Sequence, residues 1–182
     1  MNAPTSLTPV LIALGANLGD RAENLNRAVH ELTACGALTD LRASRWWETQ
    51  PVGYTEQPAF LNGVLFGRTT LSAPTLLAVL QKVEKALGKA TPFRNGPRQL
   101  DLDIIFFGST EIREGDLQLP HPRWAERGFV VRPALSLLES TPPPENFPTE
   151  WATAIRRAAK ILQTTDPDWS IMHPHGPDMS QQ

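Results

Sequence analysis

The chain has 182 residues, of which 41% are hydrophobic and 20% charged, and its formal net charge is -2. These values are typical of one globular domain with a sizeable core, and they exclude a collagen-like or wholly disordered chain. The near-neutral charge argues against a duplex nucleic acid as partner, because proteins that bind one normally carry a basic excess.

Hydrophobic period and turn residues predict the elements in chain order. A polar start is followed by a strand at Val10–Leu14, and Asp20 is placed to cap a helix. Bulky residues predict a second strand at Leu38–Trp47, and the run "ETQPVGYTEQP" after it predicts a loop. The later elements are expected as a strand at Phe60–Thr70, a helix from Ser72 to Leu87, a strand at Arg98–Phe107, an edge hairpin within Glu111–Leu119, and helices at Arg123–Leu138 and Thr149–Gln163.

The predicted order is βαββαβ with C-terminal additions. It indicates an α+β fold of the ferredoxin-like kind, a four-stranded antiparallel sheet with helices on one face. We expect a single domain over residues 1–163 and a flexible tail over residues 164–182. Trp46 and Trp47 are adjacent, so on a strand they face opposite sides; we expect one in the core and the other near the following loop or in solvent.

Cysteine content and hydropathy bear on location. The single cysteine, Cys35, cannot form an internal disulfide, and no apolar run approaches the ~20 residues that cross a bilayer. The chain start lacks a basic region followed by an apolar stretch. We therefore expect a monomer in the cytoplasm, associated with neither membrane nor nucleic acid.

The stretch "GPRQLDLDIIFFG" carries two carboxylates inside an apolar strand. Because side chains alternate along a strand, Asp101 and Asp103 point to one face while Leu102 and Ile104 point to the other. Two carboxylates about 7 Å apart repel each other unless a cation lies between them, and their hard oxygens suit Mg²⁺. The alternative is a merely solvated pair of acids.

Basic residues near this pair favour a phosphate ligand. Lys85, Lys89, Arg94 and Arg98 lie just upstream, and phosphoryl transfer uses metal ions and guanidinium groups together. The chain has no glycine-lysine loop of the Walker type; "GANLGD" has the glycines without the lysine and is also explained as a strand-to-helix turn.

The stretch "TQPVGYTEQPAFLNG" suggests a site for a flat heterocycle. A ring can stack on Phe60, and the amide of Asn62 offers a donor and an acceptor to a ring edge that has both. The alternative is that Phe60 and Leu61 are ordinary core residues.

Four ordered motifs resemble the 6-hydroxymethyl-7,8-dihydropterin pyrophosphokinase family of folate biosynthesis. They are "ALGANLGDR", "TQPVGYTEQPAFLN", "RNGPRQLDLDII" and "LPHPRWAERGFVVRP", and the resemblance covers about Val10 to Leu138. It implies Mg²⁺-dependent transfer of pyrophosphate from ATP, the co-substrate, to the pterin hydroxymethyl oxygen, with release of AMP.

The resemblance also implies roles for individual residues. Asp101 and Asp103 would hold two Mg²⁺ ions and act in catalysis with Arg98, Lys89 and Arg94. Phe60 and Phe129 would sandwich the pterin, Asn62 would bind its pyrimidine edge, and backbone groups near three residues would complete the pterin site: Thr49, Pro51 and Val52. The positions expected near ATP are Gln81, Glu84, Arg98, Ile104, His121 and Arg127.

The chain departs from the family pattern before the "RNGPRQLDLDII" motif. Many members have an Arg-x-Arg pair there, where this chain has Lys89 and Thr91. Lysine keeps the charge and loses the two-pronged hydrogen bonding of arginine, so we expect weaker binding of phosphate there unless Arg94 substitutes. Two other hypotheses stay open: a binding protein that has lost transfer activity, and an RNA-binding module, for which two aspartates on the sheet are unsuited.

Overall fold

The computed structural model describes residues 7–88, 93, 96–115 and 117–175. These residues form, in order, β1 (Thr8–Ala16), α1 (Arg21–Ala34), β2 (Thr39–Ala43), β3 (Trp46–Thr49), β4 (Phe60–Thr69), α2 (Ala73–Ala86), β5 (Asp101–Phe107), β6 (Ile112–Glu114), β7 (Leu117–Leu119), the 3₁₀ turn η1 (Trp124–Glu126), α3 (Gly128–Leu138), α4 (Thr149–Thr165), the 3₁₀ turn η2 (Trp169–Ile171) and β8 (His173–His175). None of the helices in these ranges is long and apolar enough to cross a membrane.

The first two helices begin where the sequence predicts. Asp20 caps α1 by accepting a hydrogen bond from the Glu23 amide at 3.0 Å, and Ser72 caps α2 in the same way through the Thr75 amide. After α2, Gly88 adopts a φ of +92°, which a residue with a side chain rarely adopts. Both helices therefore have their predicted starts, and α2 ends at its predicted glycine.

The sheet is antiparallel, as predicted, and larger than predicted. Among the described residues it has six strands in the order β5-β1-β4-β3-β8, with β2 also paired to β4. The expected four strands are therefore too few. The hairpin β6–β7 is confirmed, but it forms a separate two-stranded sheet and is no edge of the main sheet.

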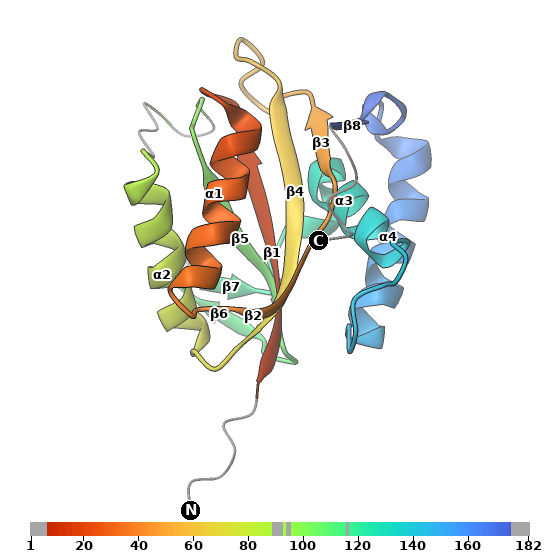
Figure 1. The fold of residues 1–182 in the computed structure, drawn as a ribbon. Helices are drawn as coiled ribbons and strands as arrows, with labels where there is room; N and C mark the ends of the chain where they lie inside the picture. Colours follow the sequence, from red (N-terminus) through yellow and green to blue (C-terminus); the bar gives the residue numbers. More distant parts are fainter. Residues whose placement is uncertain (1–6, 89–92, 94–95, 116, 176–182) are drawn as a thin grey trace, which may run out of the picture.

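Helices cover both faces of the sheet, so the expectation of helices on one face is wrong. In Figure 1, α1 and α2 lie on one side of the strands and α3 and α4 on the other. Each side has its own apolar cluster, since Ile12 and Leu65 pack with α1 and α2 while Leu11 and Phe66 pack with α3 and α4. The strands are thus buried between two helical layers.

A bulge in β5 changes which of its side chains face each helical layer. The register between β1 and β5 shifts between Leu11 and Ile12, which leaves Ile105 without a partner in the ladder. Ile105 and Phe106 both join the cluster under α3 and α4, whereas Ile104 and Phe107 join the opposite one.

The predicted strand Leu38–Trp47 is two strands, β2 and β3, on the same side of β4. Ser44 separates them, because its hydroxyl accepts a hydrogen bond from the Val64 amide at 2.9 Å and donates one to the Arg45 carbonyl at 2.8 Å. Trp46 and Trp47 face opposite sides as expected, but both are buried, each in a different cluster. The expectation that only one of them lies in the core is therefore wrong.

Two further boundaries differ. The helix expected from Arg123 begins at Gly128, after the turn η1. Residues 164–175 are ordered where a flexible tail was expected: α4 runs to Thr165, Trp169 and Met172 are buried, and β8 pairs with β3. Residues 176–182 of the expected tail lie outside the described residues.

Candidate active site

A glycine on the central strand opens the floor of a cavity on the face that carries α3 and α4. Gly15 of β1 lies in register between Asn62 of β4 and Asp101 of β5. A methyl group on Gly15 would approach Asn62 Oδ1 to 2.6 Å, closer than carbon and oxygen tolerate. The absence of a side chain on Gly15 therefore leaves room for the Asn62 amide.

The predicted carboxylate pair lines this cavity, and each member has a guanidinium partner. Asp101 Oδ2 lies 2.9 Å from Arg98 Nη2, and Asp103 Oδ2 lies 3.5 Å from Arg127 Nη1. Burial, and after it the charge of Asp101, raises the pKa of Asp103. The geometry thus places two acids together although the charge of Asp101 disfavours the ionisation of Asp103, and a cation between them would relieve that conflict.

His121 lies beside the pair with its side chain oriented. Its backbone amide donates to the Ile105 carbonyl at 2.9 Å, and its Nδ1 accepts a hydrogen bond from the Arg123 amide at 3.2 Å. Burial, and after it the charge of Arg127, lowers the pKa of the imidazole. The ring is therefore neutral near pH 7, and since Nδ1 is an acceptor, the proton is assigned to Nε2 as a donor.

Two aromatic rings in the cavity each have one of the same two arginines above them. Arg98 Cζ is 5.3 Å from the Phe60 ring centroid, and Arg127 Cζ is 5.6 Å from the Phe129 ring centroid. Each arginine therefore joins a ring to a carboxylate, so the rings and the acids are positioned by shared contacts.

The amide of Asn62 is fixed and almost fully buried. Its side chain is 6% exposed, and its Nδ2 donates to Thr49 Oγ1 at 2.7 Å. The side-chain oxygen faces the space above Gly15. A fixed amide with an oxygen toward the cavity can select a ring that carries hydrogen-bond donors.

The whole cavity has a volume of about 940 Å³, large enough for two small molecules side by side. The residues that line it come from β1, β4 and β5, from the end of β3 and the loop after it, from the segment between His121 and the start of α3, and from the end of α4 and the segment after it. They are Ala13, Leu14, Gly15, Thr49, Gln50, Val52, Gly53, Phe60, Asn62, Arg98, Asp101, Asp103, His121, Arg123, Ala125, Glu126, Arg127, Gly128, Phe129, Ile161, Leu162, Thr165, Asp166, Pro167, Asp168 and Met172.

Over the described ranges there is no cluster of three or more His, Cys, Asp and Glu side chains that could hold a metal ion. Asp101 and Asp103 alone would give a cation two carboxylates. Mg²⁺ is often held in that way, since it keeps waters and takes further oxygens from substrate phosphates. The donor set therefore fits a metal that arrives with a phosphate ligand.

Comparison with known proteins identifies the family. Residues 11–139 match the sequence profile of 7,8-dihydro-6-hydroxymethylpterin-pyrophosphokinase (HPPK). The chain belongs to the HPPK family.

Curated relatives agree with this assignment. The chain is 41% identical over 128 residues to the 2-amino-4-hydroxy-6-hydroxymethyldihydropteridine pyrophosphokinase of Bacillus subtilis, a match that covers 70% of this chain and 77% of the relative. It is 44% identical over 131 residues to the mitochondrial folate synthesis bifunctional protein of Arabidopsis thaliana, covering 72% of this chain and 24% of that protein. The chain thus spans about a quarter of the length of this second relative.

Solved structures share the fold. The wild-type HPPK-DHPS of Plasmodium falciparum with pteroate superposes with a TM-score of 0.62 at 12% identity, covering 93% of this chain and 46% of that one. At this identity the likeness concerns the α+β fold alone.

Most of the residues that the HPPK resemblance singled out lie together in the cavity. They are Thr49, Val52, Phe60, Asn62, Arg98, Asp101, Asp103, His121, Arg127 and Phe129. This places the expected pterin residues and the expected metal ligands in one cavity, although their roles stay predictions.

Six of the predicted residues lie elsewhere or outside the described ranges. Pro51 is next to Val52 but does not line the cavity, and Ile104 is buried in the cluster under α1 and α2. Gln81 is exposed on α2, and Glu84 is buried there with Oε1 accepting a hydrogen bond from the Leu102 amide at 2.8 Å. The last two, Lys89 and Arg94, lie outside the described residues.

Asn17 does not line the cavity but is hydrogen-bonded to Arg98, which does, and the sequence alone did not point to it. It is 3% exposed; its Nδ2 donates to Gln57 Oε1 and to the Pro58 carbonyl, and its Oδ1 accepts from the Arg98 amide at 2.8 Å. Asn17 therefore joins the loop before β4 to Arg98. "GANLGD" was explained as a simple turn, and the only signal was an amide in the middle of a turn after an apolar strand.

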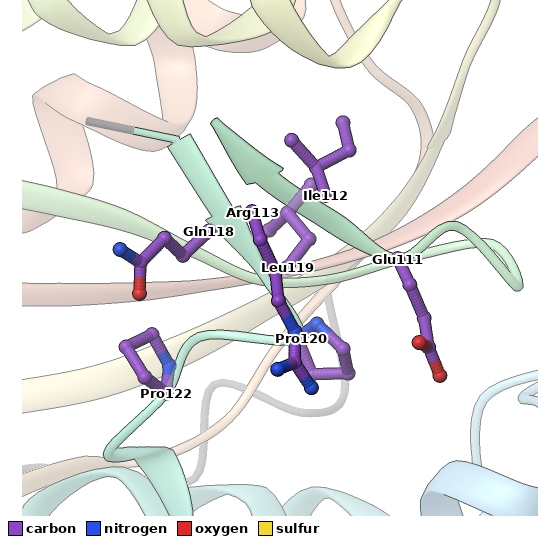
Figure 2. A pocket seen from close by; sticks show the side chains of 7 residues that line it. All are labelled: Glu111, Ile112, Arg113, Gln118, Leu119, Pro120 and Pro122. Carbon is purple, nitrogen blue, oxygen red and sulfur yellow. The ribbon is translucent and has the colours of Figure 1, made fainter. Parts of the chain in front are cut away.

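A smaller cavity of about 370 Å³ adjoins the hairpin β6–β7. Figure 2 shows the side chains around it, which are Glu111, Ile112, Arg113, Gln118, Leu119, Pro120 and Pro122. None of the predicted site residues lines it, but His121, between its two prolines, lines the larger cavity.

Proposed function

We propose that this protein transfers the β,γ-diphosphate of ATP to the hydroxymethyl oxygen of 6-hydroxymethyl-7,8-dihydropterin and releases AMP, a step of folate synthesis. One observation carries the proposal: a single cavity holds a carboxylate pair with two arginines next to two aromatic rings and a buried amide. Family membership supports the same activity.

The aromatic half of the cavity suits the pterin. Phe60 and Phe129 offer faces for stacking a flat bicyclic ring, and Asn62 is fixed by Thr49 so that its oxygen can accept from the ring's nitrogen donors. Because the amide is held before the ligand arrives, little rotamer freedom is lost on binding. In this arrangement the pterin hydroxymethyl group would point toward the carboxylates.

The polar half suits the triphosphate. Asp101 and Asp103 would hold Mg²⁺, which when bound supplies positive charge to the phosphate oxygens; we propose two ions, as the family resemblance implies. Arg98 and Arg127 offer guanidinium donors at the same place, and the Nε2 proton of neutral His121 can be donated to a phosphate oxygen.

The reaction follows from that positioning. The hydroxymethyl oxygen forms a bond to the β-phosphorus while the bond from this phosphorus to the α,β-bridging oxygen breaks, so that AMP leaves with that oxygen and the hydroxyl proton passes to solvent. The residues act by holding the two reactants in line and by stabilising charge on the transferred group. Their contribution is orientation and electrostatics, with no covalent intermediate on the protein.

Other parts of the assignment remain proposals with their own support. The near-neutral charge and single cysteine favour a cytoplasmic protein without a nucleic-acid partner, and we propose a monomer. We also propose that β1, α1, β2, β4, α2 and β5 form a ferredoxin-like unit to which the remaining elements are added; their strand order supports this.

The experiment is AMP formation from ATP by the purified protein, with Mg²⁺ or with EDTA, in the presence and absence of the pterin. AMP that requires both pterin and Mg²⁺ is the expected result. Binding of ATP and pterin without AMP would refute the transfer activity and favour a binding protein instead. Hydrolysis of ATP without pterin would refute the proposed acceptor.

A further inference from the structure

The segment that follows α4 contributes to the cavity although it lies outside residues 11–139, which match the family profile. We call residues 166–175 the C-terminal segment. It includes η2 and β8, and four of its residues line the cavity: Asp166, Pro167, Asp168 and Met172. A part of the site is therefore built from outside the matched region.

The C-terminal segment is attached to the rest of the protein at two places. Its strand β8 pairs with β3, placing His173 opposite Glu48, next to Thr49. The Arg132 guanidinium lies over two tryptophan rings. Its Cζ is 5.1 Å from the Trp169 ring centroid of this segment and 4.7 Å from the Trp47 ring centroid of β3. These contacts hold the segment against β3 and α3.

A third contact lies in the wall of the cavity. A methyl group on Gly128 would overlap the Asp166 carboxylate and come within 2.6 Å of Met172 Cε. Both side chains therefore pack closely against Gly128, the first residue of α3. The backbone amide of Asp168 donates to Asp166 Oδ1 at 3.0 Å, which fixes the carboxylate. No side chain caps α3 at Arg127, and a carboxylate near a helix N-terminus is favourable.

Gly128 stands between two residues of the site. Arg127 faces Asp103, and Phe129 offers its ring to the cavity. Any shift of the α3 N-terminus would move both, and a displacement of about 1 Å in a positioning group can lower a rate 100-fold.

We propose that Asp166 and Met172 are positioning residues that hold the N-terminus of α3 so that Arg127 and Phe129 face the substrate. Neither acts on the reacting atoms. The inference rests on the proposed function, because its main readout is the KM for pterin. It concerns residues outside the region that matches the family profile.

The test compares Asp166→Ala with Asp166→Asn and with Ser170→Ala, an exposed position in the same segment. We expect Asp166→Ala to raise the KM for pterin about fivefold or more and to raise the KM for ATP as well, since Phe129 and Arg127 move together. Asp166→Asn, which keeps the shape, should have a smaller effect, and Ser170→Ala none. A pterin KM unchanged in Asp166→Ala would overturn the proposal.

A double-mutant cycle separates positioning from general weakening of the fold. In a Phe129→Leu background, Asp166→Ala should raise the KM for pterin by less than about twofold, because the ring through which it acts on the pterin is absent. If the increase in the KM for pterin in the double variant equals the product of the increases in the two single variants, the proposal is overturned. A second pair of variants tests the close packing at Gly128. Gly128→Ala alone should raise the KM for pterin, and adding Asp166→Ala should lower this KM again in part, because it makes room for the methyl group.

One readout does not depend on turnover. The amides of Val130 and Val131 both donate to the Arg127 carbonyl, at 2.9 and 3.0 Å, and their hydrogen exchange reports the first turn of α3. Asp166→Ala should accelerate this exchange relative to Ser170→Ala, and equal rates would count against the proposal. If wild-type protein makes no AMP, the proposed function fails while this exchange still tests the role of Asp166.

Discussion

Asp103→Asn should make the metal-free protein more stable while abolishing AMP formation. Asp101 and Asp103 are two residues apart on one face of β5, about 7 Å. Two unit charges at that distance repel by about 0.6 kcal/mol in water and about 2.4 kcal/mol at an effective dielectric constant near 20. Asparagine keeps the shape and removes this repulsion.

The variant also loses an ion pair, which reduces the gain. Arg127 and Asp103 are 3.5 Å apart with side chains 25% and 43% exposed, and pairs this exposed contribute about 0.2–1 kcal/mol. The net expectation is a gain of about 1 kcal/mol in the free energy of unfolding, or a rise in Tm of about 2–4 °C for a chain of this length.

The pH dependence of stability predicts the same sign for the effect of Asp103→Asn. Burial and the charge of Asp101 raise the pKa of Asp103, so its ionisation is less favourable in the folded than in the unfolded chain. The destabilisation is therefore present above the folded pKa and disappears as the pH falls through it. The Tm advantage of Asp103→Asn should be largest near neutral pH and shrink toward about pH 4, close to the usual pKa of a carboxyl group.

The assay is thermal unfolding in EDTA at both pH values, with Asp101→Asn as the matched control. Asp101→Asn relieves the same repulsion but loses the 2.9 Å contact between Asp101 and Arg98. The side chains of Arg98 and Asp101 are only 20% and 26% exposed, so the change in Tm should be a smaller rise or a fall. A drop of about 2 °C or more in Asp103→Asn at neutral pH, or a larger gain in the control, would refute the reasoning.

Three other substitutions test the site and the sheet. Asn62→Ala should raise the pterin KM by about 10- to 100-fold, the effect of losing hydrogen bonds worth about 1–3 kcal/mol, with kcat much less affected; a change confined to the KM for ATP would contradict the role given to this amide. Arg98→Ala should lower kcat for AMP formation by about 100-fold or more, as removal of a group that stabilises transition-state charge does, and raise the pterin KM less; steady-state kinetics in both substrates decides, and a loss seen only in the pterin KM would count against it. Gly63→Ala should destabilise the fold by about 1–3 kcal/mol in urea unfolding, because the added methyl group would overlap the buried Trp46 ring, and unchanged stability would show that the ring can move without strain.

The parts of the fold that local pattern controls could be predicted from the sequence. Asp20 and Ser72 cap helices because a short polar side chain before an apolar period satisfies free amides. Asp101 and Asp103 share a face because a strand alternates with period two. In each case the cause lies within a few residues of the effect.

The parts that failed depend on distant contacts. Nothing local marks Ser44 as the break between β2 and β3, since the bond that makes it comes from the Val64 amide, 20 residues away. His173–His175 has three exposed residues with a proline and no alternation, so only the free edge of β3 makes it a strand. The change of face at Ile105 and Phe106 likewise depends on a register shift against β1, which no period within β5 predicts.

The same limit applies to the site. Most of the residues expected to bind metal and pterin could be placed in the cavity because they lie in recognisable motifs, whereas Asn17 and Asp166 contact residues 40 and 38 positions away. A side chain whose importance lies in the element it holds leaves no local signal, because the sequence near it specifies only a turn.

The position of the cavity follows from a gradient of side-chain size along the central strand. On the face under α3 and α4, successive inward positions of β1 are Leu11, Ala13 and Gly15. Leu11 is buried in the apolar cluster, Ala13 lies at the border of cluster and cavity, and Gly15 forms the floor. The inward side chains of β1 thus become smaller at every second residue, which opens space for the cavity.

The flanking strands change along the same face from apolar to polar. On β4 the inward positions pass from Val64 in the cluster to Asn62 in the cavity, and on β5 from Phe106 to Asp103 and Asp101. The buried end supplies the packing that keeps the strands in register, and the open end presents an amide and two acids at fixed spacing. Since one continuous set of strands serves both, the rigidity of the core extends directly to the cavity, and the arginines and rings need only be positioned from the segments that surround it.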